Sequence, residues 1–252
     1  MVAAVKLHRH VGRRRAARFL AEGPNLIEAA LRRGLVSEVF ATEDAAHRFA
    51  AMLADVPVHL VTERAAKALS ETVTPVGLVA VCATPETSLG EVLAASPRLV
   101  AVAVEISEPG NAGTLIRIAD AMGADAVVFA GHSVDPYNGK CLRASAGSIF
   151  SIPVVTEDDP GSAVSELAGT GLQVLATTID GEMSLDSPAL QAALAEPTAW
   201  LFGPEAHGLP AELTASATHR VHIPMPGAAE SLNVAAAAAI CLYQSARAHR
   251  RS

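Results

Sequence analysis

Three short segments of this 252-residue chain combine glycine with amide, carboxylate, hydroxyl or guanidinium side chains. They read NAGTLIR at 111–117, GPEAHGL at 203–209 and IPMPGAAESLNV at 223–234. Glycine allows a ligand to approach the backbone closely, and a guanidinium suits phosphate recognition. A proline-rich loop supplies rigid backbone that can hold a base through main-chain hydrogen bonds. The three segments therefore predict a ligand site built from loops.

Each segment also has a purely structural explanation. Arg117 could form a salt bridge with Glu105 or Asp120, and Glu205 could be a solvated loop carboxylate. His207 lies on a predicted loop, where histidines without a chemical role are common. The third segment has residue types that cap helices, although capping does not explain the prolines before them.

The elements around these segments form an alternating pattern. Apolar runs without polar alternation predict buried strands at Leu99–Glu105, Ala126–Ala130, Gln173–Thr177, Trp200–Phe202 and Arg220–Ile223. Helices are predicted between them at Asn111–Met122, Leu142–Ser148, Pro160–Gly169, Ser187–Ala195 and Leu232–Ala246. Such an α/β order predicts a parallel sheet covered on both faces, with ligands beyond the carboxyl ends of the strands.

A smaller α/β domain is predicted before a polar connector near Pro85–Pro97, which divides the chain into 1–88 and 89–252. Its predicted helices are Ala16–Leu20, Pro24–Arg33, Asp44–Ala54 and Glu63–Ser70, the last with Thr62 as N-cap. Its predicted strands are Val36–Ala41, Val56–Val61 and Val76–Cys82.

Composition narrows the class of protein. Half of the residues are hydrophobic, yet no apolar run reaches the roughly 18 residues of a membrane span. The three cysteines lie far apart, which gives no metal or disulfide pattern and fits a cytoplasmic protein. The net charge of −7 disfavours a nucleic-acid partner, but the opening segment KLHRHVGRRRAARFL contains no acid. That segment is either a basic contact surface or a solvated terminus.

Together, NAGTLIR, GPEAHGL and IPMPGAAESLNVA resemble, in this order, the motifs of the SpoU (TrmH-like) family in the SPOUT class of RNA methyltransferases. VDPYNGKCLRASAGSIFSIPV also resembles that family, and the match extends from about Leu99 to the C-terminus. RRRAARFLAEGPNLIEAAL resembles the family's L30e-like substrate-binding domain. The resemblance implies an S-adenosyl-L-methionine-dependent enzyme that methylates a ribose 2′-hydroxyl in RNA, most simply 23S ribosomal RNA, with tRNA as the alternative. It further implies a deep trefoil knot at about 200–244 and a homodimer formed through the knotted domain.

The resemblance also implies roles for particular residues. Those shaping the catalytic site are Arg117, Asn111, Glu205, Ser231 and Asn233. Those contacting the cofactor are Thr178, Leu201, Gly203, Ile223, Met225 and Leu232. Those contacting RNA are Arg13, Arg14 and Arg15, and no metal is implied. Arg117 is either a general base or a phosphate clamp, and a guanidinium pKa above about 12 favours the clamp.

Two other classes of protein are compatible with parts of the sequence. An RNA-binding or ribosome-assembly protein that has lost catalysis would not need to bind S-adenosyl-L-methionine. A nucleotide-binding enzyme is suggested by GHSVDPYNGKC at 131–141, but the glycine spacing of a phosphate loop is absent and Cys141 replaces its Ser or Thr. The sequence is compatible with a role in ribosome maturation and with one in antibiotic resistance.

Overall fold

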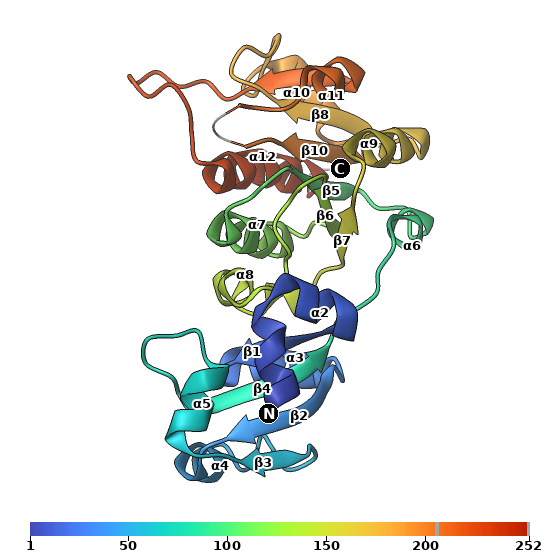
Figure 1. The fold of residues 1–252 in the computed structure, drawn as a ribbon. Coiled ribbons are helices and arrows are strands. Elements are labelled where there is room, and N and C mark those ends of the chain that lie inside the picture. The colour runs from blue at the N-terminus through green and yellow to red at the C-terminus, as the bar shows by residue number, and fades with distance from the viewer. Residues whose placement is uncertain (205–206, 251–252) are drawn as a thin grey trace. The chain divides into compact units, whose positions relative to one another are not determined.

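The computed structural model describes residues 1–204 and 207–250. These residues form two compact units (Figure 1). Unit 1 combines Met1–Glu86 with Asp135–Phe150, and unit 2 combines Thr87–Val134 with the chain from Ser151 onward. The predicted division at residue 88 assigned 135–150 to the second domain, whereas the contacts of that segment group it with unit 1.

Unit 2 contains a seven-stranded parallel sheet in the order β7-β6-β5-β10-β8-β11-β9. Its strands are β5 (Leu99–Val104), β6 (Ala126–Ala130), β7 (Val154–Glu157), β8 (Gln173–Thr177), β9 (Met183–Ser184), β10 (Thr198–Phe202) and β11 (His219–His222). Every residue of β5, β6 and β10 is buried, because helices cover both faces of the sheet.

The helices of unit 2 divide between the two faces. They are α6 (Leu89–Ala94), α7 (Pro109–Ala121), α9 (Pro160–Gly169), α10 (Pro188–Ala193), α11 (Ala211–Ser216) and α12 (Val234–His249). Residues of α6, α9 and α11 share one core cluster with alternate residues of β5. On the opposite face α7 and α12 pack against each other and onto β5, and α12 also packs on β10 (Figure 1). The Trp200 indole donates a hydrogen bond to Ser245 Oγ at 2.9 Å, which fixes α12 to β10.

The chain does not fill this sheet in sequence order. β10 lies between β5 and β8, while β11 lies on the other side of β8. Because the strands are parallel, the loops after β5, β8, β10 and β11 all leave the same edge of the sheet. The three motif segments follow β5, β10 and β11, so the topology brings them to that edge.

Unit 1 contains a four-stranded sheet in the order β1-β4-β2-β3, in which β2 and β3 are parallel and the other pairs antiparallel. Its strands are β1 (Arg18–Glu22), β2 (Val36–Ala41), β3 (Val58–Leu60) and β4 (Leu78–Ala83). Its helices are α1 (Val2–Val5), η1 (Lys6–His8), α2 (His10–Ala16), α3 (Pro24–Arg32), α4 (Glu43–Arg48), α5 (Glu63–Leu69), α8 (Gly139–Ser145) and η2 (Ser148–Phe150).

The predicted helix at 16–20 is wrong. Helix α2 ends at Ala16, Ala17 takes a left-handed φ of 48°, and 18–22 form β1 instead. Pairing with β4 and burial of Phe19 override the local helical preference. The predicted helix at 44–54 is also too long, since α4 ends at Arg48.

The other comparisons of prediction with structure concern short elements and helix caps. The strands β7 and β9 were not predicted, since one has four residues and the other two. The helix predicted to begin at Asn111 begins instead at Pro109, with Glu108 as the N-cap of α7. The predicted cap Thr62 is confirmed, since its hydroxyl accepts a hydrogen bond from Ala65 N. Within the described ranges, no helix combines the length and the apolar character needed to cross a membrane.

Candidate functional site

A cavity of about 600 Å³ opens at the carboxyl edge of the unit 2 sheet. This volume lies within the range of small-molecule and cofactor sites, about 300–1,000 Å³. The walls come from the loops after β8, β10 and β11, from α11, and from the first turn of α12. Lining residues include Thr178, Asp180, Gly203, His207, Leu209, Thr214, Ile223, Met225, Ser231, Leu232 and Ala237.

The loop after β10 is built around a glycine that cannot carry a side chain. A Cβ on Gly203 would lie 2.7 Å from Leu209 N and 2.8 Å from Gly208 C. Gly208 itself has a φ of +65°, a conformation that favours glycine. The backbone therefore folds back closely against position 203, which only glycine can occupy without a shift of the loop.

The loop after β8 carries an unsatisfied polar atom. Thr178 N donates to Val221 O at 3.0 Å, which continues the pairing of β8 with β11. The Thr178 hydroxyl oxygen is buried and has no hydrogen-bond partner among the described residues. Buried polar groups are almost always paired, so this hydroxyl is available to a ligand in the cavity.

Three contacts with β11 hold the same loop in place. A Cβ on Gly181 would lie 2.7 Å from Arg220 O, and the Gly181 carbonyl lies 2.8 Å from His222 Nδ1. Glu182 accepts hydrogen bonds from Arg220 N at 2.9 Å and from Arg220 Nε at 2.8 Å. Backbone N–H groups donate to this carboxylate and lower the pKa of Glu182, and the N–H of Arg220 has the largest effect.

The third motif reaches the cavity through the start of α12. Asn233 is the N-cap of that helix, because its Oδ1 accepts from Ala235 N at 3.0 Å and from Ala236 N at 3.4 Å. Its Nδ2 donates to Asn111 Oδ1 at 3.0 Å. Asn111 lies in the first turn of α7, so this hydrogen bond joins the first motif to the third.

Arg117 lies exposed on α7. Among the described residues no ion pair to it is found, so the salt bridge with Glu105 or Asp120 that could have explained it is absent there. Glu105 follows β5 and has a φ of 52°, so the backbone turns sharply where the strand leads towards the first motif. A guanidinium in this position can bind an anion that arrives from solution.

The residues predicted to contact the cofactor do not all line the cavity. Five of the six line the cavity, namely Thr178, Gly203, Ile223, Met225 and Leu232. The side chain of Leu201 is instead fully buried in the core of the sheet, and its carbonyl accepts from the Thr177 hydroxyl at 2.8 Å. Ser231 also lines the cavity, and Glu205 lies outside the described residues.

Sequence reasoning missed part of the cavity wall. Ile179 and Asp180, in the loop after β8, line it, and so do Ala211 and Thr214 of α11 and Ala237 in the first turn of α12. The rule that ligands bind beyond the carboxyl ends of parallel strands predicts the first two, because the strand at 173–177 was itself predicted. The helical residues carried no comparable signal.

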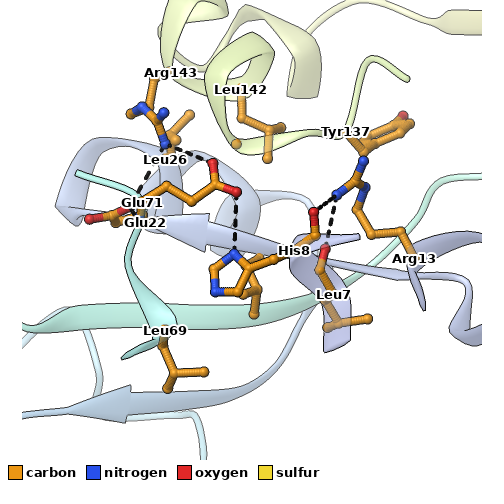
Figure 2. A pocket seen from close by; sticks show the side chains of 12 residues that line it. Leu7, His8, Arg13, Glu22, Leu26, Leu69, Glu71, Tyr137, Leu142 and Arg143 are labelled. Atoms are coloured by element: carbon orange, nitrogen blue, oxygen red, sulfur yellow. Dashed lines mark hydrogen bonds and ion pairs between the residues drawn. The ribbon is translucent and has the colours of Figure 1, made fainter. Parts of the chain in front are cut away.

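The three arginines expected to contact RNA have different environments. Arg13 is only 7% exposed, and its guanidinium donates to Asp135 at 2.6 Å. It also donates to Leu7 O at 2.9 Å and to His8 O at 3.0 Å (Figure 2). These bonds leave Arg13 unsuited to a phosphate. Arg14 and Arg15 are exposed on the same helix. In the part of the chain that the structure describes, no cluster of His, Cys, Asp and Glu is suited to a metal ion.

Residues 98–243 match the SpoU rRNA Methylase family, and residues 3–80 match the MRM3-like substrate binding domain. The 23S rRNA (guanosine(2553)-2′-O)-methyltransferase RlmP of Bacillus subtilis is 38% identical over 94% of this chain and 92% of its own length. A 23S rRNA (uridine(2479)-2′-O)-methyltransferase of Streptomyces viridochromogenes is 38% identical over 56% of this chain and 50% of its own. The crystal structure of the SpoU methyltransferase AviRb from Streptomyces viridochromogenes, in complex with AdoMet, has a TM-score of 0.85 and 29% identity over 99% of this chain and 97% of that chain.

Proposed function

The chain belongs to the SpoU family of RNA methylases, and we propose that it transfers a methyl group from S-adenosyl-L-methionine to a ribose 2′-hydroxyl of 23S ribosomal RNA. The observation that carries this proposal is the cavity at the carboxyl edge of the unit 2 sheet, which the second and third family motifs line, while the Asn111–Asn233 hydrogen bond attaches the first motif to the third. The two 23S rRNA methyltransferases described above are each 38% identical to this chain over the aligned residues.

The cavity fits S-adenosyl-L-methionine on two independent observations. A side chain on Gly203 would collide with the loop that returns over it, so a flat group can lie against bare backbone there. The Thr178 hydroxyl is a buried polar atom that lacks a partner among the described residues. Thr178, Gly203, Ile223, Met225 and Leu232 would hold this cofactor, with Leu201 supporting the wall from the core. The bound cofactor supplies a methyl group already activated on a sulfonium.

The side chains around the cavity then have two tasks, alignment of the ribose oxygen and removal of its proton. We assign alignment to Arg117, whose exposed guanidinium can clamp a backbone phosphate of the RNA. The Asn111–Asn233 hydrogen bond fixes the first turn of α7 to the cap of α12. Ser231 lines the cavity beside that cap, and Glu205 belongs to the proposed catalytic set by its position in the second motif.

Arg117 is better suited to the clamp than to the base. The guanidinium pKa lies above about 12, so a neutral arginine would be costly near pH 7. The Arg117 side chain is exposed on α7, so its planar fork is open to a phosphate that arrives from solution. A clamp needs only the charged form, which is the form present.

We further propose a knotted, dimeric, cytoplasmic enzyme. The passage of β10 between β5 and β8, followed by the return of α12 onto β5 and β10, supports threading of the C-terminal part. Helix α12 exposes Ile240 and Tyr243, 37% and 49% accessible, which lie three residues apart and therefore on one side of the helix. A second copy of the chain is the proposed occupant of that apolar surface. Light scattering during gel filtration tests the dimer, and Ile240→Asp should give the monomer.

Transfer of labelled methyl from S-adenosyl-L-methionine to unmodified 23S rRNA and to unmodified tRNA tests the activity. Label in 23S rRNA, together with one linkage that becomes resistant to alkali, is the expected result because a 2′-O-methyl group blocks cleavage there. Label in tRNA alone would move the substrate to the alternative class. Cofactor binding without label in either RNA would favour an RNA-binding protein that has lost catalysis.

A further inference from the structure

The segment Asp135–Phe150 belongs structurally to unit 1, although β6 precedes it and β7 follows it in unit 2. The chain therefore passes between the two units three times, after residues 86, 134 and 150. Two of these crossings lie at the two ends of the segment, after residues 134 and 150. The contacts that hold the segment in unit 1 therefore also hold the ends of the chain connections to β6 and β7.

Apolar packing makes the segment part of the unit 1 core. Phe19 of β1 is fully buried, and its ring lies 5.0 Å from that of Tyr137 and 5.9 Å from that of Phe150, measured between centroids. Cys141 and Leu142 of α8 are also fully buried. Burial raises the pKa of the Cys141 thiol to about 12, with a smaller contribution from the negative charge of Asp135.

A buried ion pair attaches the start of the segment to α2. Arg13 Nε donates to Asp135 Oδ2 at 2.6 Å, and the two side chains are 8% and 16% exposed. The other carboxylate oxygen accepts from Tyr137 N at 2.8 Å, which fixes its orientation. The remaining Arg13 bonds go to carbonyls of η1, shown as dashed lines in Figure 2. Each charge is thus compensated, as a buried pair requires.

A second charged group attaches α8 to the same unit. Arg143 Nη1 lies 3.5 Å from Glu71 Oε2 and 3.8 Å from Glu22 Oε2, and His8 Nδ1 lies 3.3 Å from Glu71 Oε1 (Figure 2). The cavity between these residues measures about 20 Å³, enough for one water molecule. The cluster is therefore a joint between elements of unit 1, with no room for a larger ligand.

Helix α2 presents its three consecutive arginines in different directions. Successive residues of a helix point about 100° apart, and here Arg13 turns inward while Arg14 and Arg15 are exposed. Gly12 allows this close packing, because a Cβ there would lie 2.0 Å from Lys6 O. The buried arginine thus sets the rotation of the helix that carries the exposed ones.

Resting on the proposed function, we propose that Arg13 and Asp135 are positioning residues for the RNA. Their ion pair fixes α2, and with it Arg14 and Arg15, to the segment that follows β6. Arg13 itself touches no RNA phosphate. Without the pair, α2 must be ordered when RNA binds, which weakens binding although the same phosphates are contacted, and cofactor binding in unit 2 is unchanged.

The test compares Asp135→Asn with Glu28→Gln. The first change removes the charge but keeps an oxygen for Tyr137 N, and the second breaks an exposed ion pair with Arg32 in the same unit. For Asp135→Asn we expect a KM for 23S rRNA about tenfold higher or more, because ordering α2 on binding opposes RNA association. The dissociation constant of S-adenosyl-L-methionine and the salt dependence of RNA binding stay as in the wild type. Glu28→Gln changes none of these.

Arg13→Gln and hydrogen exchange separate the alternatives. Faster exchange in 10–16 and 135–150, with an unchanged salt slope of RNA binding, is expected. A salt slope that falls by about 0.7–0.9, the value of one phosphate contact, with unchanged exchange would show that Arg13 binds RNA and would overturn the proposal. So would a wild-type RNA KM in a folded Asp135→Asn protein with faster exchange. Arg13→Lys, which keeps the charge, serves if Arg13→Gln does not fold.

Failure of the proposed function gives a different pattern. A wild-type protein that binds 23S rRNA but transfers no methyl group would refute the activity, while the RNA affinity of Asp135→Asn would still decide the positioning role. A wild-type protein that binds no RNA would overturn both.

Discussion

The unit 2 cavity and the unit 1 charged cluster use similar residue types in opposite ways. The cavity measures about 600 Å³, its walls depend on glycine backbone, and one buried hydroxyl on it has no partner among the described residues. The cluster encloses about 20 Å³, and its arginines are bonded to carboxylates and carbonyls. The contrast is clearest between two arginines. Arg117 is exposed, whereas Arg13 is 7% exposed and its guanidinium makes three hydrogen bonds. Polar groups left unsatisfied mark a site for a ligand, whereas fully satisfied groups mark architecture.

Arg117→Ala is the strongest test of this contrast. We expect a loss of about a thousandfold in kcat, because a transition-state contact of an arginine is typically of this size. The melting temperature and the dissociation constant of S-adenosyl-L-methionine should not change, since the side chain is exposed and makes no ion pair among the described residues. The measurement is single-turnover methyl transfer to 23S rRNA. Arg98→Ala is the matched control, because Arg98 is exposed at the amino end of β5, away from the cavity edge.

The opposite result would give Arg117 a structural role like that of Arg13. If Arg117→Ala lowered the melting temperature and kept kcat within threefold, the residue would be architectural despite its exposure. Arg117→Lys sharpens the positive case, because an ammonium keeps the charge but not the planar fork that binds phosphate in two places.

Sequence reasoning predicted unit 2 better than unit 1 for a physical reason. Runs such as LVAVAV at 99–104 and AVVFA at 126–130 are buried on both faces, so their composition alone marks them as strands. In unit 1, RFLAE at 18–22 has the composition of a helix and becomes a strand only through its partner β4. That pairing joins residues about 60 positions apart, and local pattern does not encode it.

The same reasoning explains the outcome for site residues. Gly203 and Asn233 could be singled out because loops after buried strands need a reason to contain glycine and amides. Arg13 could not be separated from Arg14 and Arg15, because the sequence does not show that Asp135 comes within 2.6 Å of it. Leu201 lies two residues before Gly203, and its inward direction follows from the register of β10 between β5 and β8.

The glycine walls of the cavity give the second test. Gly203→Ala should raise the dissociation constant of S-adenosyl-L-methionine at least about a hundredfold, which corresponds to about 2.7 kcal/mol. The new Cβ would meet backbone atoms at 2.7–2.8 Å, so the loop must open and the cavity wall with it. Calorimetry measures the affinity. Gly169→Ala is the control, since a Cβ there has no atom within 4 Å, and wild-type affinity of Gly203→Ala would mean that the wall is not built on bare backbone.

The alkylation rates of the three cysteines compare, in one experiment, how readily each unit opens. Cys82 and Cys141 are buried in unit 1 and have pKa values raised by burial to about 12, and burial also raises the pKa of Cys241 on α12. The thiolate is the reactive form, so each cysteine reacts only when its surroundings open. S-adenosyl-L-methionine at 30 times its dissociation constant should slow alkylation of Cys241 roughly thirtyfold, because α12 begins at the cavity.

The two cysteines of unit 1 are the internal controls for that measurement. Mass spectrometry after pulsed alkylation follows all three sites in the same sample, and we expect Cys82 and Cys141 to react at rates unchanged by the cofactor. Equal protection of all three cysteines would mean that the units open together, and the energetic contrast between cavity and cluster would disappear.

The smallest expected effect comes from the exposed arginines of α2. Arg14→Gln and Arg15→Gln should each weaken 23S rRNA binding about threefold to tenfold at low salt, because each removes one phosphate contact of a flexible side chain. The slope of log affinity against log salt should fall by about 0.7–0.9 for each change, and the melting temperature should stay constant since neither side chain is buried. Filter binding at several salt concentrations measures this slope. Arg13→Gln should show the reverse, a lower melting temperature with an unchanged slope, because its guanidinium is already occupied by Asp135 and two carbonyls. If Arg14 and Arg15 also leave the slope unchanged, the basic residues of α2 do not contact RNA, and the RNA surface of unit 1 must lie on another element.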